Sequence, residues 1–160
     1  MIINPQYLIS NEIITFPETI NINKHLQQNG IDIDCIELTE LTGTLNISEK
    51  HKESVTSAPV SLNDDVWHLK KGSVYEFNSS FEVSVPSNMG GSVIGRSTFN
   101  RAGILIRSSW FDSGFKGTLG GTIYCSNDCM LTKGTRIGQF IMHEAASAKL
   151  YDGQYQGKKS

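Results

Sequence analysis

The sequence predicts a mostly β protein, built as a β-sandwich or a barrel-like jelly roll. From residue 31 onward, short runs of alternating or β-branched residues recur along the chain. Gly, Asn, Ser and Pro separate these runs, and helical periodicity is weak nearly everywhere. Many short strands with turn residues between them are typical of sandwiches and jelly rolls.

The N-terminal region holds the best helical pattern, near residues 11–28, although Pro17 interrupts it. We therefore expect a short helical element there. The segment 31–38 alternates apolar with polar residues, which predicts a half-buried strand. Further strands are predicted at 73–85, 92–95, 104–106, 118–125 and 136–143.

Between these strands, residues 44–65 are polar and poorly patterned, which indicates a strand followed by a surface excursion. Two similar segments, 69–72 and 131–134, each end in glycine before a strand, so we expect two equivalent turns with positive φ. We expect one domain over residues 1–150 and a flexible tail over 151–160, which has almost no apolar residues.

Composition excludes several classes of function. A net charge of −2 disfavours broad binding to nucleic acid or anionic membranes, and no apolar run reaches the length of a membrane span. The three cysteines form no CxxC pair and the start of the chain lacks a secretory pattern, so we expect a cytoplasmic protein with reduced thiols. The four histidines are scattered, and we predict no metal ligand among the side chains.

Residues 95–117 carry the chemistry. Two guanidiniums (Arg96, Arg101) and two hydroxyls (Ser97, Thr98) lie in one short segment bounded by glycines, and the carboxylate of Asp112 follows. Arginine forks and hydroxyl donors suit phosphate oxygens, and one carboxylate can activate a water. This pattern indicates hydrolysis of a polyphosphate ester.

Six segments in order resemble motifs of one superfamily, the dCTP deaminases and deoxyuridine triphosphatases (dUTPases). They are residues 28–32, 69–72 with 80–86, 95–103 (Gly-Arg-Ser-Thr-Phe-Asn-Arg-Ala-Gly), 112–117 (Asp-Ser-Gly-Phe-Lys-Gly), 133–139 and 153–157 (Gly-Gln-Tyr-Gln-Gly). The resemblance implies a distorted jelly roll (β-clip) and a homotrimer whose active sites lie between subunits. It also implies a deoxypyrimidine triphosphate as ligand, with Mg²⁺ carried on the phosphates.

The sequence departs from the deaminases at two places. A glutamate that moves protons at the base in deaminases is matched here by Thr122 or a close neighbour, and no Asp or Glu lies between Asp112 and Asp128. The segment 103–112 is about two residues shorter than the deaminase loop that carries base recognition. Since threonine cannot replace the glutamate at neutral pH, the first departure counts against deamination, and the second leaves the details of base selectivity open.

Hydrolysis of dUTP to dUMP and pyrophosphate is therefore the predicted activity. The resemblance implies that Asp112 activates the water and that Arg96, Ser97, Thr98 and Arg101 contact phosphate. Tyr155, Gln156 and Lys158 of the tail would close over the nucleotide. Two alternatives stay open: a dCTP deaminase or bifunctional enzyme, and a non-catalytic nucleotide-binding or interaction module.

Simpler interpretations of single residues also stay open. Arg96 and Arg101 could be solvated or ion-paired, and Asp112 could be a turn residue. Asp32 is expected to support the fold or the trimer, and Trp110 to pack in the core or an interface.

Overall fold

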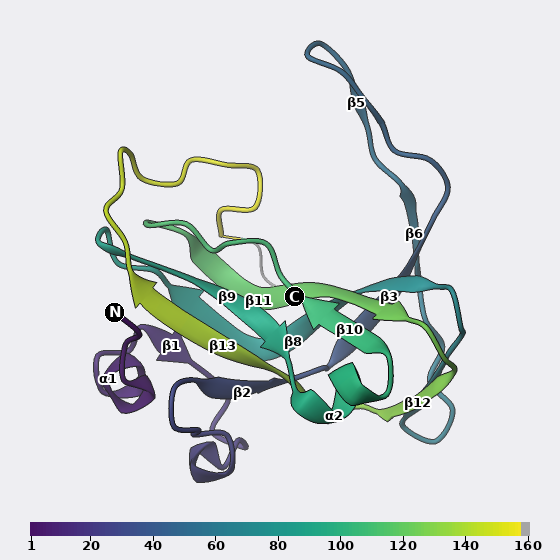
Figure 1. Ribbon diagram of the computed structural model, residues 1–160, viewed down its shortest axis with the longest axis horizontal. Helices are drawn as coiled ribbons and strands as arrows, with labels where there is room; N and C mark the ends of the chain where they lie inside the picture. Colours follow the sequence, from purple (N-terminus) through teal and green to yellow (C-terminus); the bar gives the residue numbers. More distant parts are fainter. Residues whose placement is uncertain (158–160) are drawn as a thin grey trace.

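The computed structural model describes residues 1–157, and antiparallel strands dominate it (Figure 1). In chain order the strands are β1 (Ile14–Thr15), β2 (Ile31–Asp34), β3 (Glu37–Thr42), β4 (Asn46–Ile47), β5 (Lys52–Glu53), β6 (Thr56–Pro59), β7 (Val66–Leu69), β8 (Val74–Ser84), β9 (Met89–Gly95), β10 (Ile104–Arg107), β11 (Lys116–Cys125), β12 (Cys129–Thr132) and β13 (Arg136–Glu144). The helical segments are α1 (Pro5–Ser10), the 3₁₀ turn η1 (Ile22–Lys24) and α2 (Ser97–Arg101). The predicted mostly β fold is confirmed.

One curled sheet organises the described residues. Its strand order is β2-β13-β9-β10-β11-β8-β3-β6, and β1 pairs with β8 outside this path. Strands β12 and β7 form a separate two-stranded ladder. The two longest strands, β8 and β11, lie side by side near the middle of the sheet and carry the groove described below.

Strand β8 shows how the sheet separates its two faces. Buried residues alternate with half-buried ones over its whole length. Tyr75, Phe77 and Phe81 point to the core, where they pack with Trp67 and Phe140. The intervening residues therefore lie on the opposite face, as the two-residue period of a strand requires.

Five predicted strands, at 73–85, 92–95, 104–106, 118–125 and 136–143, are confirmed as β8, β9, β10, β11 and β13. The short helical element expected near the N-terminus is confirmed as α1, but α1 lies before the segment that carried the pattern. Residues 11–28 contain β1 and η1, whereas α1 precedes them. Asn4 caps α1 by accepting a hydrogen bond from the Gln6 N–H at 2.9 Å, and Pro5 supplies a preset φ for the first turn.

The segment 31–38 is divided between β2 and β3, and β2 is fully buried rather than half-buried. Its aspartates are inside because other groups satisfy them. Asp34 accepts hydrogen bonds from Ser79 Oγ at 2.8 Å, from the Ser80 N–H at 2.8 Å and from Ser80 Oγ at 2.6 Å. Burial of a carboxylate is tolerated when its oxygens are paired in this way.

The polar segment 44–65 forms an exposed arm, as expected of a surface excursion. Strands β4 and β5 pair at its outer part, and Figure 1 shows this hairpin standing out from the body of the protein. The two predicted turns are also confirmed, since Gly72 and Gly134 have φ of 82° and 81°. No helix within residues 1–157 has the length and apolar character needed to cross a membrane.

Candidate active site

A groove of about 920 Å³ opens on the face of the sheet opposite the core. Its walls come from β3, β8 and β11, from the base of the arm, from the connection after β10 and from the C-terminal segment. The lining residues are Leu41, Ser54, Val55, Ser57, Glu76, Asn78, Arg107, Ser108, Ser109, Trp110, Phe111, Asp112, Phe115, Thr118, Gly120, Gly121, Thr122, Tyr151 and Tyr155. Its volume suits a ligand of the size of a nucleotide.

Asp112 lies in this groove on a firmly held turn. Its carbonyl accepts from the Phe115 N–H at 3.0 Å, and Gly114 takes φ of 85° to close the turn. The buried Ser113 hydroxyl donates to the Met89 carbonyl at 2.6 Å, while Phe111 exchanges two backbone hydrogen bonds with Gly91. Because its neighbours are fixed on both sides, the backbone of Asp112 is held in place, and its exposed side chain lines the groove.

The predicted phosphate-binding segment lies elsewhere in the protomer. Ser97, Thr98 and Arg101 are on α2, and their side chains are exposed. Neither they nor Arg96 belong to the residues that line the groove. One protomer therefore does not bring the carboxylate and the predicted phosphate ligands together.

Arg96 is engaged in an ion pair. Its Nε lies 3.3 Å from Oδ2 of the buried Asp32, and its Nη1 donates to the Arg136 carbonyl at 3.2 Å. Arg136 Nη1 reaches the same carboxylate oxygen at 3.3 Å, and Gln27 Nε2 donates to it at 3.2 Å. Burial raises the pKa of Asp32, whereas the charges of Arg96 and Arg136 act to lower that pKa. In this protomer, Asp32 supports the fold and Arg96 holds the start of α2 against β2 and β13.

The C-terminal segment docks beside Asp112. The Tyr151 N–H donates to the Ser113 carbonyl at 2.8 Å, and the Tyr151 ring meets Phe115 edge-on with centroids 5.5 Å apart. Gln156 Oε1 accepts from the Lys116 N–H at 3.1 Å, and its Nε2 donates to the Gly114 carbonyl at 3.0 Å. Tyr155 lines the groove itself, whereas Lys158 lies outside the described residues.

Sequence reasoning missed two charged residues of the groove, Glu76 and Arg107. They belong to different strands from the Asp112 segment, so no local motif connects them. The available signal was the alternation of β8, which places Glu76 and Asn78 on one face. Within the described residues, no group of three or more His, Cys, Asp or Glu side chains is arranged to hold a metal ion.

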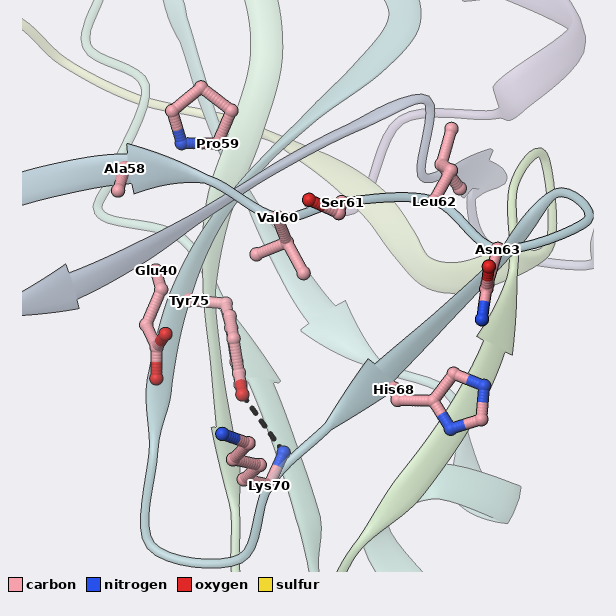
Figure 2. Close-up of a pocket in the computed structure, with 10 residues that line it drawn as sticks. All are labelled: Glu40, Ala58, Pro59, Val60, Ser61, Leu62, Asn63, His68, Lys70 and Tyr75. Carbon is pink, nitrogen blue, oxygen red and sulfur yellow. Dashed lines mark hydrogen bonds between the residues drawn. The ribbon is translucent and has the colours of Figure 1, made fainter.

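A smaller cavity of about 460 Å³ lies along the connection between β6 and β7 (Figure 2). Tyr75 is at its inner side, where its hydroxyl accepts a hydrogen bond from the Lys70 N–H at 2.9 Å. Glu40 lines it too, and its Oε1 accepts from Ser73 Oγ at 2.9 Å. This cavity holds none of the predicted site residues, so the groove is the better candidate for the active site.

Comparisons with known proteins agree on one family. The family model described as dCTP deaminase-like matches residues 7–145. A probable deoxyuridine 5'-triphosphate nucleotidohydrolase of Methanosarcina acetivorans is 25% identical over 148 residues, which cover 88% of this chain and 86% of the relative. A dCTP deaminase, dUMP-forming, of Methanosphaerula palustris is 26% identical over 147 residues, which cover 84% of this chain and 78% of that protein.

Among solved structures, the 2'-deoxycytidine 5'-triphosphate deaminase from Agrobacterium tumefaciens superposes with a TM-score of 0.67 at 14% identity. The superposition covers 86% of this chain and 44% of the Agrobacterium chain, so this chain spans less than half of that length. At this identity the likeness concerns the fold, and it confirms the fold that the motifs implied.

Proposed function

The chain belongs to the dCTP deaminase-like family, and on that premise we propose that it hydrolyses dUTP to dUMP and pyrophosphate. The Methanosarcina relative, named a probable dUTP nucleotidohydrolase, supports this choice. The observation that carries the proposal is the groove itself, which presents the exposed Asp112 carboxylate and has Thr122, not a glutamate, on β11.

Asp112 is the proposed activator of water. Its carboxylate accepts a proton from a water placed in line with the α-phosphate, and pyrophosphate leaves. The substrate is the Mg²⁺ complex of dUTP, in which the cation is coordinated mainly by phosphate oxygens and water. An exposed carboxylate such as Asp112 suits a hard cation of this kind, and the cation would neutralise charge on the leaving group.

A complete site on this proposal needs two copies of the chain. Asp112 lies in the groove of one protomer, and the exposed Ser97, Thr98 and Arg101 of α2 reach the phosphates from a neighbouring protomer. A homotrimer with cyclic symmetry builds three such sites from one repeated contact. Arg96, held by Asp32, acts here by positioning α2.

Replacing Arg101 with alanine should reduce kcat/KM for dUTP on the order of 30-fold or more, because a phosphate charge loses its partner (about 2 kcal/mol). A mixture then tests whether the site is shared. The Arg101→Ala and Asp112→Asn chains, each nearly inactive alone, are unfolded together and refolded at equal concentration. Random assembly gives ~25% of the sites both intact residues, so about a quarter of wild-type activity should return. Absence of any recovery would contradict a shared site.

Removing residues 154–160 should leave a folded oligomer with roughly tenfold lower turnover, since the tail can no longer close the groove. The single change Gln156→Ala removes the two hydrogen bonds to the 114–116 backbone and should show part of the loss. Gln154→Ala is the matched control, an exposed glutamine two residues earlier. Unchanged pyrophosphate release by the truncated protein would show that the tail is not a lid.

One assay separates the candidate functions. The protein is incubated with Mg²⁺ and each deoxynucleoside triphosphate, and pyrophosphate and ammonia are both measured. Pyrophosphate from dUTP without ammonia from dCTP supports the proposal. Ammonia from dCTP would support the alternative hypothesis of a deaminase, which is the activity named for the dUMP-forming relative. Nucleotide binding without either product would indicate a non-catalytic module.

A further inference from the structure

A polar row crosses the face of the sheet inside the groove. We use this name for Arg107, Thr122 and Glu76, which belong to the neighbouring strands β10, β11 and β8. Arg107 is paired directly with Thr122, and Thr122 directly with Glu76. Residues paired across antiparallel strands point to the same face with Cβ atoms about 4.5–5.5 Å apart. All three line the same groove as Asp112.

Two glycines lie next to the polar row. Gly120 and Gly121 precede Thr122 on β11 and add no side chain to the floor of the groove. A Cβ at Gly120 would come within 2.6 Å of the Phe77 carbonyl, and one at Gly121 within 2.3 Å of the Arg107 carbonyl. The strands are thus too close for larger residues here, and the floor stays uncovered.

Aromatic residues border this floor. Trp110 and Phe115 come from the connection between β10 and β11, and Tyr155 comes from the C-terminal segment. Aromatic walls favour a planar ring, and charged groups at one side of the floor would face the polar edge of such a ring. The groove therefore combines aromatic side chains that can contact a planar ring with a row of three polar groups. In order across the strands, these are the Arg107 guanidinium, the Thr122 hydroxyl and the Glu76 carboxylate.

We propose that Glu76 and Arg107 read the polar edge of the pyrimidine and select a base that carries an imide N–H. The Glu76 carboxylate accepts a hydrogen bond from N3–H of uracil, and Arg107 donates to O4. Cytosine has a lone pair at N3 and an amino group in place of O4, so in the same orientation it is repelled by the carboxylate and by the guanidinium. This inference rests on the proposed function and adds to it the residues that set its base preference.

The polar row also explains how the groove can distinguish two bases of nearly equal size. Shape alone separates such ligands weakly, whereas a polar group that must be paired separates them strongly. Glu76 is half-buried, so a repulsive contact between its carboxylate and a ligand costs more there than in open water. Arg107 is exposed at the edge of the floor, where it keeps access to a ligand entering the groove.

The test compares Glu76→Gln with wild type on dUTP and dCTP. A glutamine offers both an acceptor and a donor, so it pairs with either base. We expect the dUTP:dCTP ratio of kcat/KM to narrow at least tenfold. Glu82→Gln is the matched control: Glu82 is half-buried on the same face of β8 but is not among the groove residues. Its ratio should equal that of wild type.

Binding measurements keep the inference separate from the proposed function. Titration calorimetry with the α,β-imido analogues of dUTP and dCTP reports the same ratio without turnover. If wild type releases no pyrophosphate from dUTP, the proposed function fails. A smaller ratio of the affinities for the dUTP and dCTP analogues in Glu76→Gln would still support recognition of the base by Glu76. The inference is overturned if this ratio of affinities is unchanged in both Glu76→Gln and Arg107→Gln while circular dichroism shows that both variants are folded. Ammonia release from dCTP that is lost only in Glu76→Gln also overturns it, because Glu76 would then transfer protons.

Discussion

Replacing Asp112 with asparagine should lower kcat for dUTP hydrolysis by on the order of 10²–10⁴-fold, because the amide cannot take a proton from water. The side chain keeps its size, and the turn that holds it depends on backbone contacts and on Ser113, so the groove should keep its shape. Binding of the α,β-imido analogue of dUTP should change by less than about tenfold. Steady-state pyrophosphate release and calorimetry measure the two quantities.

Asp152→Asn is the matched control for this experiment. Asp152 is an exposed carboxylate that lies outside the groove, so its loss should not change kcat. Substantial turnover by Asp112→Asn would remove Asp112 from the role of water activator. A loss of binding as large as the loss of rate would instead assign it to holding the substrate or its cation.

Replacing Asp32 with alanine should lower the free energy of unfolding by about 3 kcal/mol, at the low end of what breaking a buried ion pair costs. The change leaves Arg96, Arg136 and Gln27 without a shared partner. The estimate is at the low end because the side chains of Arg96 and Arg136 are 36% and 35% exposed, so water can solvate their charges in part. Urea denaturation at one fixed protein concentration measures the effect.

Asp152→Ala serves as the control, an exposed aspartate far along the chain from this ion pair. If Asp32→Ala unfolded at the same urea concentration as wild type, the ion pairs of Asp32 would be dispensable for stability.

Asp32→Ala also tests the positioning of α2. Where Asp32→Ala still folds, its kcat/KM for dUTP should fall more than that of Asp152→Ala, since Arg96 loses its anchor at the start of the helix.

The strands of the sheet could be predicted because their alternation is local. Strand β8 alternates over its whole length, so its position and its two faces follow from neighbouring residues alone. Segment 31–38 misled the same reasoning, because Asp32 and Asp34 become buried through partners that lie far along the chain, including Arg96 and Ser79. A sequence pattern assigns polar residues to the exposed face, because it contains no information about partners that are distant in the chain.

The candidate site was predictable only in its parts. Asp112 and Arg101 stood out because family motifs surround them, but no motif says that α2 lies away from the groove in one protomer. Glu76 could not be identified from the residues that follow Asp112, because it lies on β8 and only the pairing of the sheet places it across from Thr122 on β11. Strand pairing decides that neighbour, and it involves residues 46 positions apart in the sequence (122 against 76).

The hydrogen bonds between Gln156 and the 114–116 segment have a consequence for how sequences of this kind can diverge. Both of its hydrogen bonds end on the main chain, at the Lys116 N–H and the Gly114 carbonyl. The side chain at position 116 is therefore free to vary over generations without loosening the tail. An insertion or deletion of one residue in that turn would not be tolerated in the same way, because it would move the Lys116 N–H and the Gly114 carbonyl away from the Gln156 amide. In descendants of this chain, the spacing between Asp112 and β11 should outlast the identity of the residues that fill it.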